Sequence, residues 1–168
     1  MQRYCIIVKK VNIGCVQITY LRKFTLAMNL LTHPNLTPEF QLTKTLETDV
    51  GVLFLYGNIV IFQANEGIVM SRKTANSLII KCLRFLKGKK WILLSNRINS
   101  YSVKPMDYKA LDRIPSLEAV GIIYYNEIAK SNADLESKFC NIHFRSFGNL
   151  MEGVEWAKEC LIDKLEII

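Results

Sequence analysis

The stretch KKWILLSNRINSYSVKPMDY, Lys89 to Tyr108, carries the strongest fold signals of the chain. Its run Trp91–Leu94 is apolar at every position, which is typical of a strand buried on both faces inside a parallel sheet. Residues 95–103 are mostly polar and show no helical or strand period. Pro105 then predicts the start of a short helix, because its fixed φ and missing N–H suit the first helical position. The stretch therefore predicts a central strand, an irregular loop and a crossover helix.

The residues before this stretch predict an antiparallel start to the sheet. The sequence VGVLFLYGNIVIFQAN, residues 50–65, contains two β-branched and aromatic runs joined at Gly57-Asn58, a pair that can adopt the positive φ angles of a two-residue hairpin. The Thr-rich segment QLTKTLETD, residues 41–49, alternates in part and suits an edge strand.

A helix is predicted between Ser71, a good N-cap, and Gly88, a good C-terminal stop. Its apolar residues recur at helical spacing, and its basic residues lie on the opposite face. Such a basic face is most often a solvated surface. The apolar stripe is Ala75, Leu78, Ile79, Cys82, Leu83 and Leu86, and the basic face is Lys73, Lys81, Arg84 and Lys87.

The remaining segments alternate between strand and helix. EAVGIIYY and NIHFRSF predict strands, and residues 127–139 predict a helix in which Ile128, Leu135 and Phe139 share an apolar face. Asn149 and Glu152 have capping-box spacing at the start of a last helix. Its apolar stripe is Leu150, Val154, Ala157, Leu161 and Leu165. We therefore predict an α/β fold with a mixed sheet, an antiparallel N-terminal hairpin followed by β-α-β-α-β-α with right-handed crossovers.

Composition excludes several classes of protein. The chain has 168 residues, the size of one domain, and no apolar run approaches the ~18 residues of a spanning helix. Five scattered cysteines without a C-x-x-C pair indicate a reducing compartment, so we expect a cytoplasmic protein. The net charge is +7, but residues 1–38 hold five basic residues and no acid, which leaves the rest nearly neutral. We therefore expect no nucleic-acid partner.

A domain boundary is expected near residue 40. Residues 1–27 are basic and acid-free, Met28 follows, and the turn-rich THPNLTPEF contains Pro34 and Pro38. We expect residues 1–40 to be an N-terminal extension, either disordered or preceding a native start at Met28, and residues 41–168 to be the folded domain.

Motifs for catalysis and cofactor binding are missing. No P-loop, G-x-G-x-x-G or G-x-S-x-G occurs, so no cofactor is predicted. Cys140 and His143 lack a second pair for a metal site, and three residues apart on a strand they point to opposite faces. Glu66 and Glu127 could serve as acid and base at one sheet edge, but we favour the simpler account that Glu66 lies in a turn and Glu127 in a helix's first turn, where its charge suits the dipole.

Polar side chains follow three predicted strands at their carboxyl ends, where open α/β sheets bind ligands and partners. We name these residues the polar rim: Asn65, Glu66, Asn96, Arg97, Asn99, Tyr101 and Asn126. Arg97 offers a fork of donors for a carboxylate or phosphate, and Tyr101 a flat surface for packing. Ser100 and Ser102 are candidate phosphorylation sites ahead of a helix. The alternative is local turn chemistry, because Asn and Ser bond their own backbone.

The order of elements resembles the STAS domain, and more closely its SpoIIAA-like relatives, which are grouped with Sec14-like (CRAL-TRIO) domains. The resemblance covers about residues 42–163 and rests on GVLFLYGNIVIFQAN, the helix from Ser71, WILLSNRINSYSVKPMDY and NLMEGVEWAKECL. Anti-anti-sigma proteins carry a phosphorylatable serine in an Asp-Ser-Ser-Gly-like turn, at a place similar to Ser100 or Ser102. This chain has neither the Asp nor the Gly. Sec14-like domains imply a lipid pocket.

Three functions remain open. The first is a non-enzymatic regulatory or binding module whose polar rim contacts a partner protein. The second is a binder of a small ligand or lipid, with a pocket between a helix and the sheet. The third is an enzyme that acts through Glu66 or Glu127. Neither the identity of the partner or ligand nor the oligomeric state is predicted.

Overall fold

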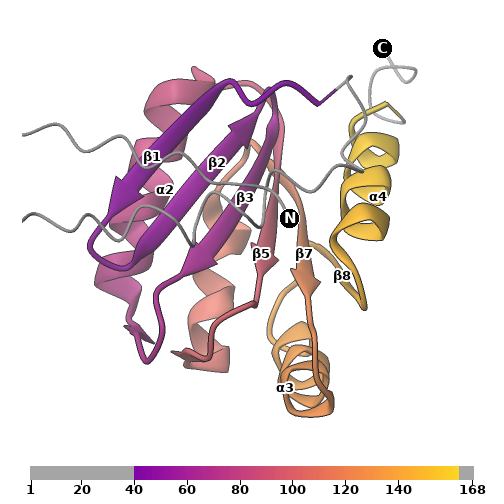
Figure 1. The fold of residues 1–168 in the computed structure, drawn as a ribbon. Coiled ribbons are helices and arrows are strands. Elements are labelled where there is room, and N and C mark those ends of the chain that lie inside the picture. The colour runs from indigo at the N-terminus through magenta and orange to yellow at the C-terminus, as the bar shows by residue number, and fades with distance from the viewer. Residues whose placement is uncertain (1–39, 163–168) are drawn as a thin grey trace, which may run out of the picture. The chain divides into compact units, whose positions relative to one another are not determined.

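A six-stranded mixed sheet runs through residues 40–162, the part of the chain that the computed structural model describes (Figure 1). Its strand order is β1-β2-β3-β5-β7-β8. The first three strands pair antiparallel, and the last three continue the sheet in parallel from β3. The predicted fold class is confirmed. The strands are β1 (Lys44–Thr48), β2 (Gly51–Tyr56), β3 (Ile59–Ala64), β5 (Trp91–Asn96), β7 (Leu117–Ile123) and β8 (His143–Phe147).

The hairpin between β2 and β3 turns at the predicted Gly57-Asn58 pair. Gly57 has a φ of +58°. Asn58 does not share this conformation, because Lys87 is the one non-glycine with positive φ among the described residues. The expectation of positive φ angles at both positions is therefore wrong for Asn58. A left-handed glycine at the first central position is the pattern of a type II′ turn.

Helices connect the parallel strands. They are α2 (Arg72–Leu86), the 3₁₀ helix η1 (Pro105–Arg113) and α3 (Glu127–Ser137), and α4 (Leu150–Ile162) follows β8. Ser71 caps α2 as predicted, and it forms a reciprocal capping box with Thr74. At the other end Lys87 and Gly88 both have positive φ, which stops the helix. The Asn149–Glu152 cap of α4 is also present.

The helices cover the two faces of the sheet at different distances. Helix α4 packs closely on one face, where an added Cβ on Gly153 would lie 2.4 Å from Ile123 Cδ1 and one on Gly121 3.2 Å from Trp156 Cζ3. On the other face α2 approaches through Leu78, Cys82 and other large side chains. Its backbone therefore stays farther from the strands than that of α4.

Two predicted details are wrong. The loop predicted to be irregular contains a short strand, β6 (Ser102–Val103), which pairs in parallel with β4 (Val69–Met70). On the predicted apolar face of residues 127–139, Ile128 is 76 % exposed and Leu135 48 % exposed, whereas Phe139, which follows the end of α3, is partly buried against the core. The buried residues of this helix are Ala133 and Glu136. Glu136 is inside because it pairs with a buried arginine described below.

The predictions for residues 1–40 lie, apart from Phe40, outside the described residues, and so does Leu165. The domain boundary near residue 40 stays a prediction. Within residues 40–162 no helix has the length and apolar character needed to cross a bilayer.

Candidate functional site

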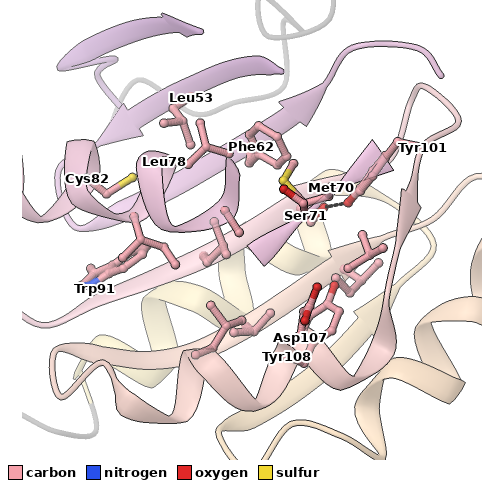
Figure 2. Close-up of a pocket in the computed structure, with 18 residues that line it drawn as sticks. Leu53, Phe62, Met70, Ser71, Leu78, Cys82, Trp91, Tyr101, Asp107 and Tyr108 are labelled. Carbon is pink, nitrogen blue, oxygen red and sulfur yellow. Dashed lines mark hydrogen bonds between the residues drawn. The ribbon is translucent and has the colours of Figure 1, made fainter. Parts of the chain in front are cut away.

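An apolar cavity of about 100 Å³ lies between α2, η1 and the sheet, and it is partly open to the surface (Figure 2). Its floor comes from the central strands and its walls from the two helices. Figure 2 shows Leu53, Phe62 and Trp91 reaching in from the strands, with Leu78 and Cys82 on α2 and Tyr108 on η1. The lining residues are Leu53, Phe62, Met70, Ser71, Ala75, Leu78, Ile79, Cys82, Trp91, Leu93, Ser95, Tyr101, Val103, Asp107, Tyr108, Leu111, Val120 and Ile122.

The mouth of the cavity lies where α2 and η1 fail to close over β5. Leu93 shows this most clearly, because it sits on an inner parallel strand and is nevertheless only partly buried. Ala75 and Ile79 of α2 and Asp107 of η1 are also partly exposed along the opening. A leucine on an inner strand is normally covered, so the gap between the helices is the reason that the cavity is accessible.

The β4–β6 pair closes one end of the cavity. It brings the loops after β3 and β5 together, and Ser102 N–H donates to the Ile68 carbonyl at 2.9 Å. This pairing places Met70 and Val103 against the cavity. At the same end, the hydroxyls of Ser95 and Tyr101 lie 2.6 Å apart and bond to each other. The cavity is thus apolar over most of its surface, with two hydroxyls at one end.

Arg97 lies behind this polar end and is buried. Its side chain is 8 % exposed, and it forms an ion pair with Glu136, whose side chain is 6 % exposed. Arg97 Nη2 also donates to the Tyr108 hydroxyl at 3.2 Å, and its guanidinium lies over the Tyr101 ring. Burial lowers the pKa of Arg97, but the two tyrosines and Glu136 outweigh it and raise the pKa above its usual value. Arg97 therefore ties β5 to η1 and α3.

The Tyr108 hydroxyl stays protonated in this cluster. Burial, and after it the neighbouring Tyr101 and Glu136, raise the pKa of Tyr108 well above its usual value. Nε of Arg97 has no hydrogen-bond partner among the described residues, so the cluster as described holds one buried donor that is not satisfied. Such a donor costs free energy, which makes the cluster sensitive to substitution.

The structure brings the polar-rim residues of three loops together at the carboxyl edge of the sheet, and it gives each an internal contact. Asn99 Nδ2 donates to the Ala64 carbonyl at 2.8 Å, and Asn96 Oδ1 accepts from the Tyr125 hydroxyl at 2.8 Å. Asn65 Nδ2 donates to the Asp49 carbonyl at 3.1 Å. That the rim contacts a partner protein stays a prediction. Asn96 and the side chain of Arg97 are buried, unlike the exposed members of the rim.

The carboxylates considered for catalysis lie apart from the cavity. Glu66 accepts the Ser100 N–H at 2.9 Å, and Glu127 lies in the first turn of α3, 4.0 Å from Lys130. Neither lines the cavity. A phosphate on Ser100 would come near the Glu66 carboxylate, whereas Ser102 is exposed on β6. Asn126 caps α3 by accepting the Ala129 N–H at 2.8 Å.

Sequence reasoning missed two side-chain pairs. Glu136 was not recognised as the partner of Arg97, because the two residues are far apart in the chain and nothing in either segment marks the contact. His143 was considered beside Cys140, but its Nδ1 lies 3.7 Å from the sulfur of Cys160 on α4. Among residues 40–162 no group of three or more His, Cys, Asp or Glu side chains is placed to hold a metal ion.

The reactivity of the Cys82 thiol tests whether this side chain lines a buried wall of the cavity. Burial raises the pKa of this thiol to about 12. Because the thiolate is the reactive form, we expect a small thiol reagent near pH ~8 to label Cys82 roughly 10³-fold more slowly in the folded protein than in urea-unfolded protein. Peptide mapping by mass spectrometry after timed labelling measures both rates. Equal rates would show that Cys82 does not line a buried wall.

Comparison with solved structures found a similar protein. It is an uncharacterised protein from the DUF3478 family with a SpoIIAA-like fold, from Shewanella loihica PV-4. The chain is similar to it at 14 % identity and a TM-score of 0.45, over 68 % of this chain and 90 % of that one. The sequence resemblance implies the same SpoIIAA-like fold. No protein-family model and no curated protein matches the chain.

Proposed function

We propose that this protein is a non-enzymatic binding module that holds a small, largely apolar molecule in the cavity between α2, η1 and the sheet. The observation that carries the proposal is the accessible apolar cavity of about 100 Å³ over the partly exposed Leu93. Ligand pockets are typically concave and apolar with a few placed polar groups, and Ser95 and Tyr101 supply such groups at one end.

Burial of apolar surface supports this proposal. The cavity walls are largely apolar and partly open to the surface, so a small apolar guest would remove apolar surface from water. Such burial contributes about 25 cal/mol per Å² of apolar surface, or about 0.8 kcal/mol per methylene.

The placement of acidic groups supports a binding role over a catalytic one. Asp107, at the mouth, is the one carboxylate among the described residues that line the cavity. Paired carboxylates for acid and base catalysis would have to face one another across a bound substrate. Glu66 and Glu127 are instead held by the turn and the helix in which they lie.

Filling the cavity is expected to abolish binding without unfolding the protein. Hexan-1-ol is a suitable neutral probe, since burial of five methylenes at about 0.8 kcal/mol each corresponds to a Kd near 1 mM. Ala75 lines the cavity, so Ala75→Phe would place a ring in it and weaken binding by about tenfold or more. Titration of backbone amide NMR shifts measures the Kd.

Asn76→Phe is the matched control. It adds a similar ring one residue along α2, at an exposed position that does not line the cavity. We expect this variant to bind hexan-1-ol like the unmodified protein. Equal weakening by the two substitutions, or shifts spread away from α2, η1 and the sheet floor, would count against the cavity as the binding site.

A further inference from the structure

We propose that the ligand of this cavity is a small amphipathic acid, whose acidic group binds a basic hollow beside the mouth. This inference rests on the proposed function, because the ligand's apolar part occupies the cavity. The hollow has a volume of about 80 Å³ and lies between the start of α2 and η1. We name it the basic notch. It is lined by Arg72, Met106, Asp107, Lys109, Ala110 and Arg113.

The notch adjoins the cavity. Asp107 lines both, and Ser71, at the cavity mouth, is followed in the chain by Arg72 in the notch. Figure 2 shows Asp107 beside Tyr108 at the η1 side of the cavity. One molecule can therefore place a short apolar chain in the cavity and a charged end in the notch.

The charges of the notch favour an anion. Arg72, Lys109 and Arg113 contribute three positive charges, and Asp107 one negative charge. Within residues 40–162, none of the three basic residues has a carboxylate within the 4.0 Å that defines an ion pair. Among the described side chains that line it, the notch therefore keeps a net positive charge.

The first turn of α2 adds to this positive potential. Backbone N–H groups at a helix N-terminus favour acidic side chains and disfavour basic ones. Helix α2 has no acidic residue in its first turn, and it begins instead with Arg72 and Lys73. Basic side chains at this position lower the stability of the free protein, and a bound anion would offset that loss of stability. The charge cluster and the helix thus favour the same kind of ligand.

The chemistry of the notch suits a carboxylate or a phosphate monoester. An arginine fork binds either group through two parallel N–H bonds, and lysine adds a point charge. The apolar part is short, because a cavity of about 100 Å³ accepts a group no larger than a small ring or a few methylenes.

The test compares three probes with the same six-carbon chain: hexan-1-ol, hexanoate and hexyl phosphate. At about 20 mM salt we expect an acid to bind about tenfold more tightly than the alcohol, a difference of about 1.4 kcal/mol. The advantage should shrink at about 0.5 M salt, because screening weakens exposed charges. A preference between the two acids identifies which group the notch takes.

The outcomes separate the two proposals. If hexan-1-ol and both acids bind with equal affinity, the inference about the acid is overturned and the cavity proposal stands. If none of the three binds, the cavity proposal fails and this inference fails with it. An advantage of the acids that does not change with salt would also overturn the role of the notch.

Variants of the notch complete the test. The double substitution Lys109→Gln and Arg113→Gln should remove most of the advantage of the acids and leave the Kd of hexan-1-ol unchanged. The control is Lys81→Gln with Arg84→Gln, which lowers the net charge equally at exposed positions of α2 outside both hollows. An equal loss in both double variants would assign the effect to the net charge of the whole protein and overturn the inference.

Discussion

Glu136→Gln is expected to lower the free energy of unfolding by about 3–5 kcal/mol, because it leaves Arg97 as a buried charge without its counter-charge. The two side chains are 8 % and 6 % exposed, so water can do little to replace the lost carboxylate. Within residues 40–162, Nε of Arg97 already lacks a hydrogen-bond partner. Urea unfolding followed by circular dichroism measures the change at constant slope.

Two controls separate the lost pairing from other effects of the substitution. Removing both charges, with Arg97→Met and Glu136→Leu together, should cost far less than Glu136→Gln alone, because no unpaired charge remains. Glu127→Gln breaks the exposed Lys130 pair on the same helix, where Glu127 is 88 % exposed, and should change stability by less than about 1 kcal/mol. If Glu136→Gln were as mild as Glu127→Gln, the buried pair would not hold α3 in place.

This ion pair changes how the polar rim can be tested. Arg97 was predicted to bind a carboxylate or phosphate of a partner, and its fork already binds a carboxylate of its own chain. A loss of partner binding on substitution of Arg97 would therefore also follow from local unfolding. Glu66 and Asn65 are exposed, so substitutions there report on a partner with less disturbance of the core.

The strands could be predicted from sequence because their patterns are local and strong. The run Trp91–Leu94 is apolar on both faces, and the folded protein buries β5 on both faces apart from the partly buried Leu93. The Gly57 turn fixes the pairing of β2 with β3, and the helix caps at Ser71 and Asn149 mark where α2 and α4 begin. In each case the signal lies within a few residues of the feature that it predicts.

The contacts that define the candidate site could not be predicted in this way. The apolar residues of α3 gave Ile128 and Leu135 as its buried face, but tertiary pairing with Arg97 turned Glu136 inward. A side chain 39 positions away along the chain decided the orientation of the helix. No local pattern of apolar residues carries that information.

The cavity is a second feature that the sequence pattern does not predict. The stripe on α2 was predicted correctly, with Leu78, Cys82 and Leu86 buried. A periodic stripe shows which face packs inward, but not how closely the helix approaches. The gap above Leu93 depends on the positions of both α2 and η1, and Met70 and Val103 reach it only through a pairing of two-residue strands.

Gly51→Ala is expected to destabilise the sheet by about 3–5 kcal/mol, through backbone strain together with overpacking. Gly51 has a φ of +152°, and an added Cβ would lie 2.2 Å from the carbonyl oxygen of Gln63 and 2.8 Å from Ala64 Cα. Both neighbours are backbone atoms of β3, so no side chain can rotate away to make room. Thermal and urea unfolding measure the loss.

Gly57→Ala is the matched control, because Gly57 also has a positive φ, +58°, but no atom of the described residues lies within 4 Å of the added Cβ. It should cost only the left-handed penalty of about 1–2 kcal/mol. Gly51 begins the strand pair whose register places Leu53 opposite Phe62, and both of these residues form the cavity floor. Gly51→Ala should therefore also weaken binding of hexan-1-ol, while Gly57→Ala should not. Equal costs for the two substitutions would show that the close approach of β2 and β3 at Gly51 does not limit stability.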